Sequence, residues 1–170
     1  MNILSQSAQI VGFIGTLLSL IYLHRKNIKN ILITKMMIDI IWGLHYAMLG
    51  AYTGLFANLI CLIREITFLK NKGEPQKYQL LIFVALNCLN TCVTWKSVYS
   101  IFPAMAGILA TYSFWQKNVT RTRLIALLNN VLFFTYDVCV GSLSGMICES
   151  LTFISVVFAL IKNNKILRRS

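Results

Sequence analysis

Ionisable side chains occur inside stretches of sequence that are otherwise apolar. Two apolar runs that meet at an uncharged turn, Gly50 to Gly54, hold Asp39, His45, Arg64 and Glu65. An ionisable group at membrane depth is costly, so it usually faces the interior of a helix bundle or a water-filled cavity. Groups that converge in such a cavity can bind a polar or cationic solute, or take up and release a proton. These residues therefore indicate a binding or transfer site inside a membrane.

The same layout returns 91 residues later in the chain. Asn130 and Asp137 precede a second uncharged turn, Gly141 to Gly145, and Glu149 follows it. Sequence identities between the two parts are few, but apolar runs, basic loops and glycine turns coincide without a gap. We therefore predict two internal repeats with the same orientation.

Polar residues of the two repeats fall at matching positions. Asp39 aligns with Asn130, Tyr46 with Asp137, and Asn58 with Glu149. Residues three or four positions apart share a helix face, so each repeat presents a polar stripe. We expect these stripes to point at a common axis and to form a solute-binding site from Asp39, His45, Tyr46, Asn58, Asn130, Asp137 and Glu149.

Several of these residues also have purely structural interpretations. Asp39 and Arg64 can form a fixed ion pair between neighbouring helices, and His45 can bond a backbone carbonyl near a helix end. Asn58 can act as an interhelical hydrogen-bond donor. Glu149 has no basic residue nearby in an apolar helix, which leaves a protonatable role open.

Composition indicates a membrane protein. The chain has 170 residues, is 57% hydrophobic and has 12% charged residues, against about 25% charged in an ordinary soluble domain. The net charge of +11 comes from basic clusters between apolar runs. That distribution is typical of membrane topology and argues against a nucleic-acid partner. The partners we expect are the lipid bilayer and an unidentified small polar solute, and a homo-oligomer of the chain stays an open alternative.

A spanning helix needs about 20 mainly apolar residues, with a range of about 17–25. Seven segments meet this description within a single membrane domain, residues 1–170: Ser7–Leu23, Ile31–Leu49, Gly54–Lys70, Tyr78–Trp95, Val98–Trp115, Leu124–Val140 and Gly145–Lys162. The predicted fold is all-α and polytopic, with repeat 1 at about 7–72, a linker helix at about 78–95 and repeat 2 at about 98–163.

The charges of the loops predict the orientation of the chain. Loops rich in Lys and Arg alternate with loops that carry little or no charge. Lys and Arg are enriched on the cytoplasmic side. We therefore expect a membrane protein with its N-terminus outside and its C-terminus in the cytoplasm.

Motifs for other chemistry are absent from the sequence. It contains no H-E-x-x-H, no G-x-S-x-G and no phosphate-binding glycine loop. We expect no enzyme activity, no catalytic residue, no metal site and no cofactor. The five cysteines all lie in apolar runs and are interpreted as small core residues.

The predicted arrangement of three, one and three helices resembles sugar transporters of the SWEET type, which contain parallel repeats. The chain departs from the SWEET and PQ-loop pattern because Pro103 is the one proline placed where their helix prolines occur. At the level of residues it resembles the YgjV-type family of bacterial inner-membrane proteins. The resemblance is most specific in HYAMLG (His45 to Gly50), Arg64 and GSLSGMICE (Gly141 to Glu149). It implies an inner-membrane location and this fold, and no particular reaction.

Two function hypotheses follow. The first is a transporter or facilitator for a small polar solute, with its site between the two repeats. The second is a membrane sensor or accessory subunit that transports nothing and uses its polar residues only to hold the bundle together.

Overall fold

The computed structural model describes residues 3–22, 25, 27–71, 75–116 and 118–167. Over these ranges the chain is helical and contains no strand, which confirms the all-α prediction. The helices are α1 (Ile3–Tyr22), α2 (Ile28–Met48), α3 (Tyr52–Lys70), α4 (Lys77–Val93), α5 (Ile101–Trp115), α6 (Val119–Val140) and α7 (Leu143–Leu167). A short 3₁₀ helix, η1 (Val98–Ser100), leads into α5.

Five helical segments are long and apolar enough to cross a membrane, by length and composition. They are Ile28–Met48, Tyr52–Lys70, Val98–Trp115, Thr120–Val140 and Leu143–Ile161. Two further apolar segments, Ser5–Ile21 and Lys77–Val93, are shorter. Each predicted span therefore corresponds to one helix, and the largest boundary differences are at the start of α6 and the end of α7.

The ends of α2 and α6 are formed in the same way. Asn27 accepts a hydrogen bond from the Lys29 backbone N–H (2.9 Å), and Asn118 accepts one from that of Arg121 (3.1 Å). These asparagine caps satisfy N–H groups that a helix start leaves without partners. After the helices, Gly50 and Gly141 have φ values of 66° and 72°, in the left-handed region where glycine avoids a steric penalty. Both predicted glycine turns are therefore present.

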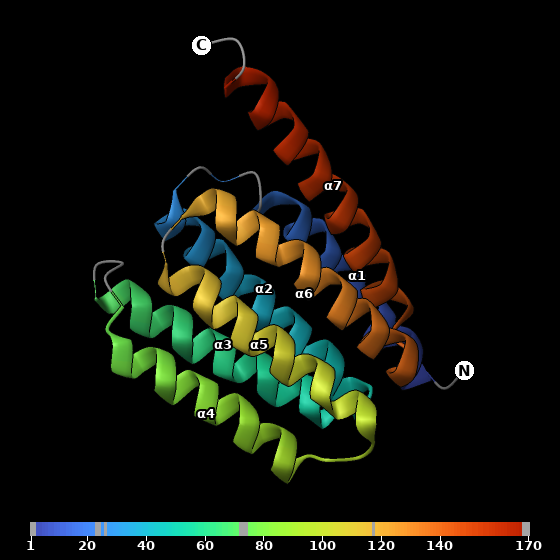
Figure 1. The fold of residues 1–170 in the computed structure, drawn as a ribbon. Helices are drawn as coiled ribbons and strands as arrows, with labels where there is room; N and C mark the ends of the chain where they lie inside the picture. The colour runs from blue at the N-terminus through green and yellow to red at the C-terminus, as the bar shows by residue number, and fades with distance from the viewer. Residues whose placement is uncertain (1–2, 23–24, 26, 72–74, 117, 168–170) are drawn as a thin grey trace.

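Helices that follow one another in sequence pack together, so α2 lies between α1 and α3, and α6 lies between α5 and α7 (Figure 1). Among the helix contacts that join these groups, α1 packs on α7 and α3 packs on α5. Helix α4 packs on α5 and α3 at one edge of the bundle, and the C-terminal part of α7 extends beyond the other helices (Figure 1). The centre of the bundle therefore lies between α1, α2, α3, α6 and α7.

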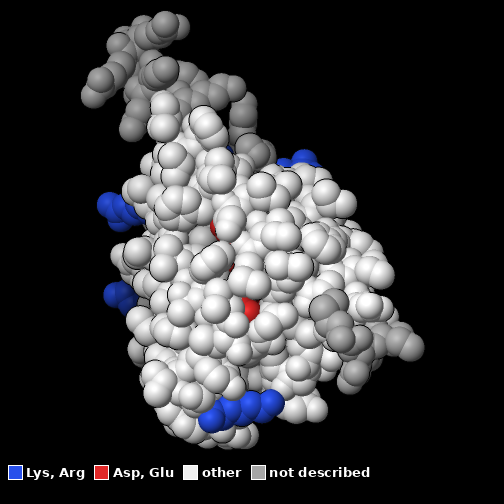
Figure 2. Space-filling view, turned by 90° about the vertical axis from the view of Figure 1, so that its right-hand side faces the viewer, with Lys and Arg blue, Asp and Glu red and all other residues white. Residues whose placement is uncertain are grey.

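Large apolar side chains cover the outside of the bundle, while polar side chains are buried inside it. Val93, Leu81 and Leu17 are 75%, 68% and 67% exposed. Figure 2 shows one such face, white over most of its area, with Lys and Arg towards its margins and a few acidic atoms deep among uncharged side chains. A soluble domain rarely exposes an apolar surface of this extent, so the distribution fits a protein whose solvent is lipid.

Candidate functional site

A cavity of about 80 Å³ lies at the centre of the bundle. Five helices supply its lining, which is Ser19 of α1, Lys35, Ile38, Trp42 and Tyr46 of α2, Asn58 of α3, Asn129, Asn130 and Phe133 of α6, and Cys148, Glu149 and Thr152 of α7. A cavity needs at least ~10–15 Å³ of such volume to hold a water, and keeps it only if polar groups are present. This space therefore suits a few waters or one compact polar solute.

Four of the predicted site residues border this cavity: Tyr46, Asn58, Asn130 and Glu149. The other three, Asp39, His45 and Asp137, do not line it and lie in the surrounding polar network. The alignment by 91 residues thus brings Asn58 and Glu149, which occupy matching positions, to one cavity.

Glu149 connects the cavity to the outer surface of the bundle. It is half-buried, and it also borders a groove of about 300 Å³ that opens between α6 and α7. The other groove residues are mostly apolar and exposed, including Val131, Phe134 and Ile154. With its amide oriented so that both of its atoms find partners, Asn130 donates to Glu149 Oε2 (2.9 Å) and accepts from Thr152 Oγ1 (3.2 Å). Glu149 therefore has a neutral donor beside it.

Tyr46 and Asp137 close the cavity towards the two glycine turns. The Tyr46 hydroxyl donates to Asp137 Oδ1 at 2.8 Å, and the two residues lie 91 positions apart. The Tyr136 ring packs edge-on against Tyr46, with centroids 5.6 Å apart, and its hydroxyl accepts from the Gly54 backbone N–H (3.0 Å). These contacts join α2, α3 and α6 at one point.

His45 holds α1, α2 and α7 together. With a hydrogen on Nδ1 it donates to the Ala8 carbonyl (2.7 Å), and Nε2 then accepts from the Ser142 hydroxyl (2.8 Å). Ser142 Oγ in turn accepts from the Gly145 backbone N–H (3.1 Å). The ring is fully buried, so of the two interpretations of His45 from sequence, the geometry favours the structural one. Close packing of α1 against the ring also supports the structural interpretation, because a Cβ on Gly12 of α1 would lie 2.9 Å from His45 Nδ1.

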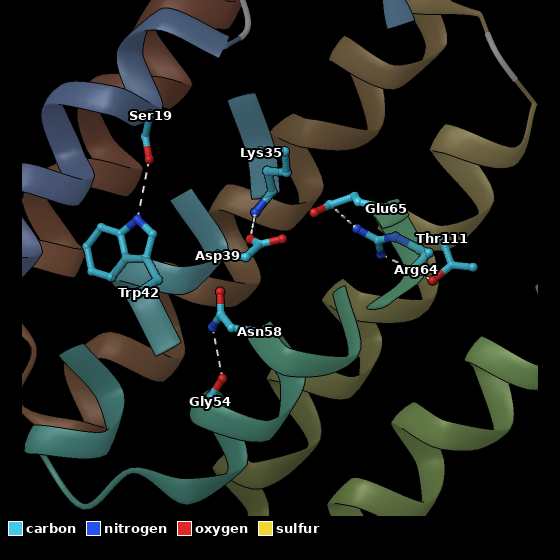
Figure 3. Close-up of polar contacts among 9 residues, drawn as sticks. All are labelled: Ser19, Lys35, Asp39, Trp42, Gly54, Asn58, Arg64, Glu65 and Thr111. Carbon is cyan, nitrogen blue, oxygen red and sulfur yellow. Dashed lines mark hydrogen bonds and ion pairs between the residues drawn. The ribbon is translucent and has the colours of Figure 1, made fainter. Parts of the chain in front are cut away.

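Charged residues of α2 and α3 form a cluster on the other side of the cavity, defined here as the charged cluster: Lys35, Asp39, Arg64 and Glu65. Asp39 forms an ion pair with Lys35, one turn earlier on α2. Arg64 pairs with Glu65 at 2.8 Å and donates to Thr111 Oγ1 of α5 at 3.3 Å (Figure 3). Its guanidinium carbon also lies 5.1 Å from the centroid of the Phe114 ring. Two ion pairs are therefore formed inside the bundle.

The predicted direct ion pair between Asp39 and Arg64 is wrong. Each of them has a different partner, because Lys35 reaches Asp39 along α2 and Arg64 turns towards α5. Glu65 lies between the two in Figure 3. They belong to one cluster without touching.

Several residues of this network were missed from the sequence, among them Lys35, Ser142 and Trp42. Lys35 precedes Asp39 by four positions in an apolar helix, a spacing that favours an ion pair, so a signal was present. Trp42 follows Asp39 on the same helix face; it is 7% exposed and donates to Ser19 Oγ (3.3 Å). No sequence signal distinguishes Ser142 from other serines in turns. Among the described residues, no three His, Cys, Asp or Glu side chains are grouped as a metal site would require.

Comparison with known proteins gives one match. No curated protein and no solved structure matches the chain. The sequence model of the family Imp-YgjV, described as bacterial inner membrane protein, matches residues 6–166. This match covers nearly the whole chain and agrees with the apolar exterior and the spanning helices. The protein therefore belongs to the Imp-YgjV family of bacterial inner membrane proteins.

Proposed function

We propose that this protein is a carrier or facilitator for a small polar solute, and that the solute binds in the central cavity. The observation that carries the proposal is the cavity lining. It takes polar groups from helices on both sides of the bundle, among them Asn58, Asn130 and Glu149. A protein that needed these groups only for packing would gain more from an apolar interior, because buried polar groups must be desolvated.

The proposed carrier consists of two parallel repeats, α1–α3 and α5–α7, joined by α4. If a two-fold axis relates the repeats, two equivalent residues can touch each other only near that axis. Tyr46 and Asp137 are equivalent by the shift of 91 residues, and they are hydrogen-bonded to each other. A second pair of contacts follows the same relation. His45 bonds Ser142 at 2.8 Å, and 91 positions on, Tyr136 donates to the Ala51 carbonyl at 3.5 Å. In the proposed repeats α1 corresponds to α5 and α3 to α7, so the contact of α1 with α7 corresponds to the contact of α5 with α3.

Alternating access then requires the two repeats to rock about this axis. The cavity is about 80 Å³, well below the ~150 Å³ that admits benzene in an engineered protein cavity. A larger solute therefore fits only if the repeats separate. The Tyr46–Asp137 bond is one of the contacts that such a movement must break on the side of the glycine turns.

The orientation of the carrier rests on its loop charges. The basic loops favour an orientation with the N-terminus outside, the C-terminus in the cytoplasm and the glycine turns outside. Reporter fusions after Arg25, Arg121 and Ser170 should be cytoplasmic, and one after Thr53 should be external. An external C-terminal reporter contradicts this orientation.

A solute screen tests the transport proposal. Purified protein is reconstituted in vesicles, and uptake of a mixture of sugars, amino acids, amines and inorganic cations is compared with that of empty vesicles. Wild type should move at least one class of solute, and Glu149→Gln should fold normally and lose that uptake. Cys139→Ser, a change on the exposed side of α6, is the matched control and should retain it.

A second candidate is a membrane sensor or accessory subunit that transports nothing. It is favoured by the fixed bonds of several polar residues: His45 bonds Ala8 and Ser142, and Asn58 donates to the Gly54 carbonyl (2.8 Å). A wild-type protein that moves no solute in the screen, with Glu149→Gln equal to it in stability between acidic and neutral pH, supports this second function.

A further inference from the structure

Two carboxyl groups meet inside the charged cluster. Asp39 of α2 and Glu65 of α3 both have side chains with no exposed surface. Each uses one oxygen for an ion pair, Asp39 Oδ1 with Lys35 and Glu65 Oε1 with Arg64. The remaining oxygens, Asp39 Oδ2 and Glu65 Oε2, accept no hydrogen bond from any described residue.

The two carboxyl groups are within hydrogen-bonding contact of each other. In Figure 3 the free oxygen of Asp39 points towards Glu65, on the side away from Lys35. Two ionised carboxylates have acceptor atoms only, so their contact offers no hydrogen bond and adds the repulsion of like charges. One proton between them removes the repulsion and makes a short, strong O–H···O⁻ bond.

No other group of the described residues donates to these oxygens. The titratable groups that face the pair are Lys35 of α2 and Cys61 and Arg64 of α3. Lys35 and Arg64 already bond the other carboxyl oxygens, and α5 reaches the cluster through Thr111 and Phe114, which contact Arg64.

We infer that Asp39 and Glu65 share one proton and form a proton-binding site beside the central cavity. Lys35 connects the site to that cavity, because it borders the cavity and pairs with Asp39. The site is one-sided: the positions 91 residues on hold Asn130 and Val156, so each molecule binds one such proton. This inference goes beyond the proposed transport, because the site exists whether or not a solute moves.

Infrared spectroscopy of the purified protein tests the inference directly, since a protonated carboxyl group has a C=O stretching band that a carboxylate lacks. Near neutral pH, wild type should show a component of this band that is absent from Glu65→Gln, from Asp39→Asn and from the double variant alike. A shared proton predicts equal losses in all three, because removing either carboxyl group leaves the other ionised beside its cation. The amide that Glu65→Gln introduces can donate to Asp39, so that variant should remain folded.

Glu149→Gln is the matched control, since it removes a carboxyl group of the cavity and leaves the pair intact; the shared component should persist in it. A component that survives in Glu65→Gln, or one that only a single variant removes, overturns the shared proton. If Asp39→Asn does not fold, the result for Glu65→Gln decides alone: loss of the component supports the inference and its persistence contradicts it.

Discussion

The charged cluster and the region 91 residues further along have similar places in their helix groups and very different chemistry. The cluster residues are Lys35, Asp39, Arg64 and Glu65, and the matching residues are Ala126, Asn130, Ser155 and Val156. Val156 is fully buried and packs with Ala126, Leu127 and Leu160. The same helix arrangement thus accepts two ion pairs on one side and alkyl groups on the other.

This difference shows that helix packing alone does not require the four charged residues of the cluster. A buried ion pair gains little over apolar residues of similar volume, because both ions must be desolvated. An apolar solution exists in the same molecule, at Ala126 and Val156. The charged cluster is therefore interpreted as a functional feature. Its proposed role is to bind the proton that Asp39 and Glu65 share.

The largest effect should come from removing one charge of the cluster. Arg64→Met leaves Glu65 buried without its cation, and breaking a buried pair in this way costs about 3–5 kcal/mol. Unfolding in detergent, followed by circular dichroism, should show this loss. Ser155→Ala at the matching position of α7 is the control and should cost about 1 kcal/mol or less. Equal losses would mean that the two regions do not differ as described.

Removing both charges of that pair should restore stability. Arg64→Met combined with Glu65→Val makes α3 resemble the apolar side, where Val156 occupies the matching position. We expect the double variant to recover at least half of the ~3–5 kcal/mol lost by Arg64→Met, since no lone charge stays buried. The same unfolding measurement checks this, and a double variant less stable than the single one contradicts the comparison.

Removing the hydroxyl groups of Tyr46 and Tyr136 should lower stability by intermediate and different amounts. Tyr46→Phe removes a bond to a buried carboxyl oxygen of Asp137, and hydrogen bonds to charged groups are worth about 1.5–3 kcal/mol. Tyr136→Phe removes the acceptor of the Gly54 N–H, and a bond between neutral groups contributes about 1 kcal/mol. Thermal unfolding of both variants should rank Tyr46→Phe as the less stable. The reverse order would mean that the Tyr136 contact is the stronger one.

The smallest change in stability should follow from Glu149→Gln. Glutamine has nearly the shape of glutamate, and Asn130 has a side-chain oxygen to donate to in both. We expect a change within about 0.5 kcal/mol, as for substitutions that break no buried network. Unfolding measured beside Asn58→Ala, which loses the bond to Gly54, calibrates the scale. A large loss would place Glu149 with the charged cluster as a residue whose ionised form holds the bundle together.

The sequence predicts much of the fold because its strongest signals are periodic. Apolar runs between basic loops located all seven helices, and the glycine turns appear with left-handed backbone at Gly50 and Gly141. Helix ends were less certain: α6 begins at Val119, earlier than the predicted Leu124, because Asn118 caps a turn that carries Thr and Arg residues.

The candidate site was predicted in part. A helix-face argument places Asn58, Asn130 and Glu149 towards the interior, and they do border one cavity. It does not decide which partner a long side chain reaches. Arg64 can turn towards α2 or α5, and only the packing of α5 against α3 determines that it bonds Thr111. Long side chains with several partners in reach are thus the part that helical periodicity leaves open.

Glu149 borders both the central cavity and the groove between α6 and α7. At this point the wall between the polar interior and the acyl chains of the bilayer is one side chain thick. A lipid-soluble carbodiimide, which reacts with carboxyl groups, can therefore reach Glu149 from within the membrane plane, whereas Asp39 and Glu65 have no exposed side-chain surface. The bundle is thus open to chemistry from its side.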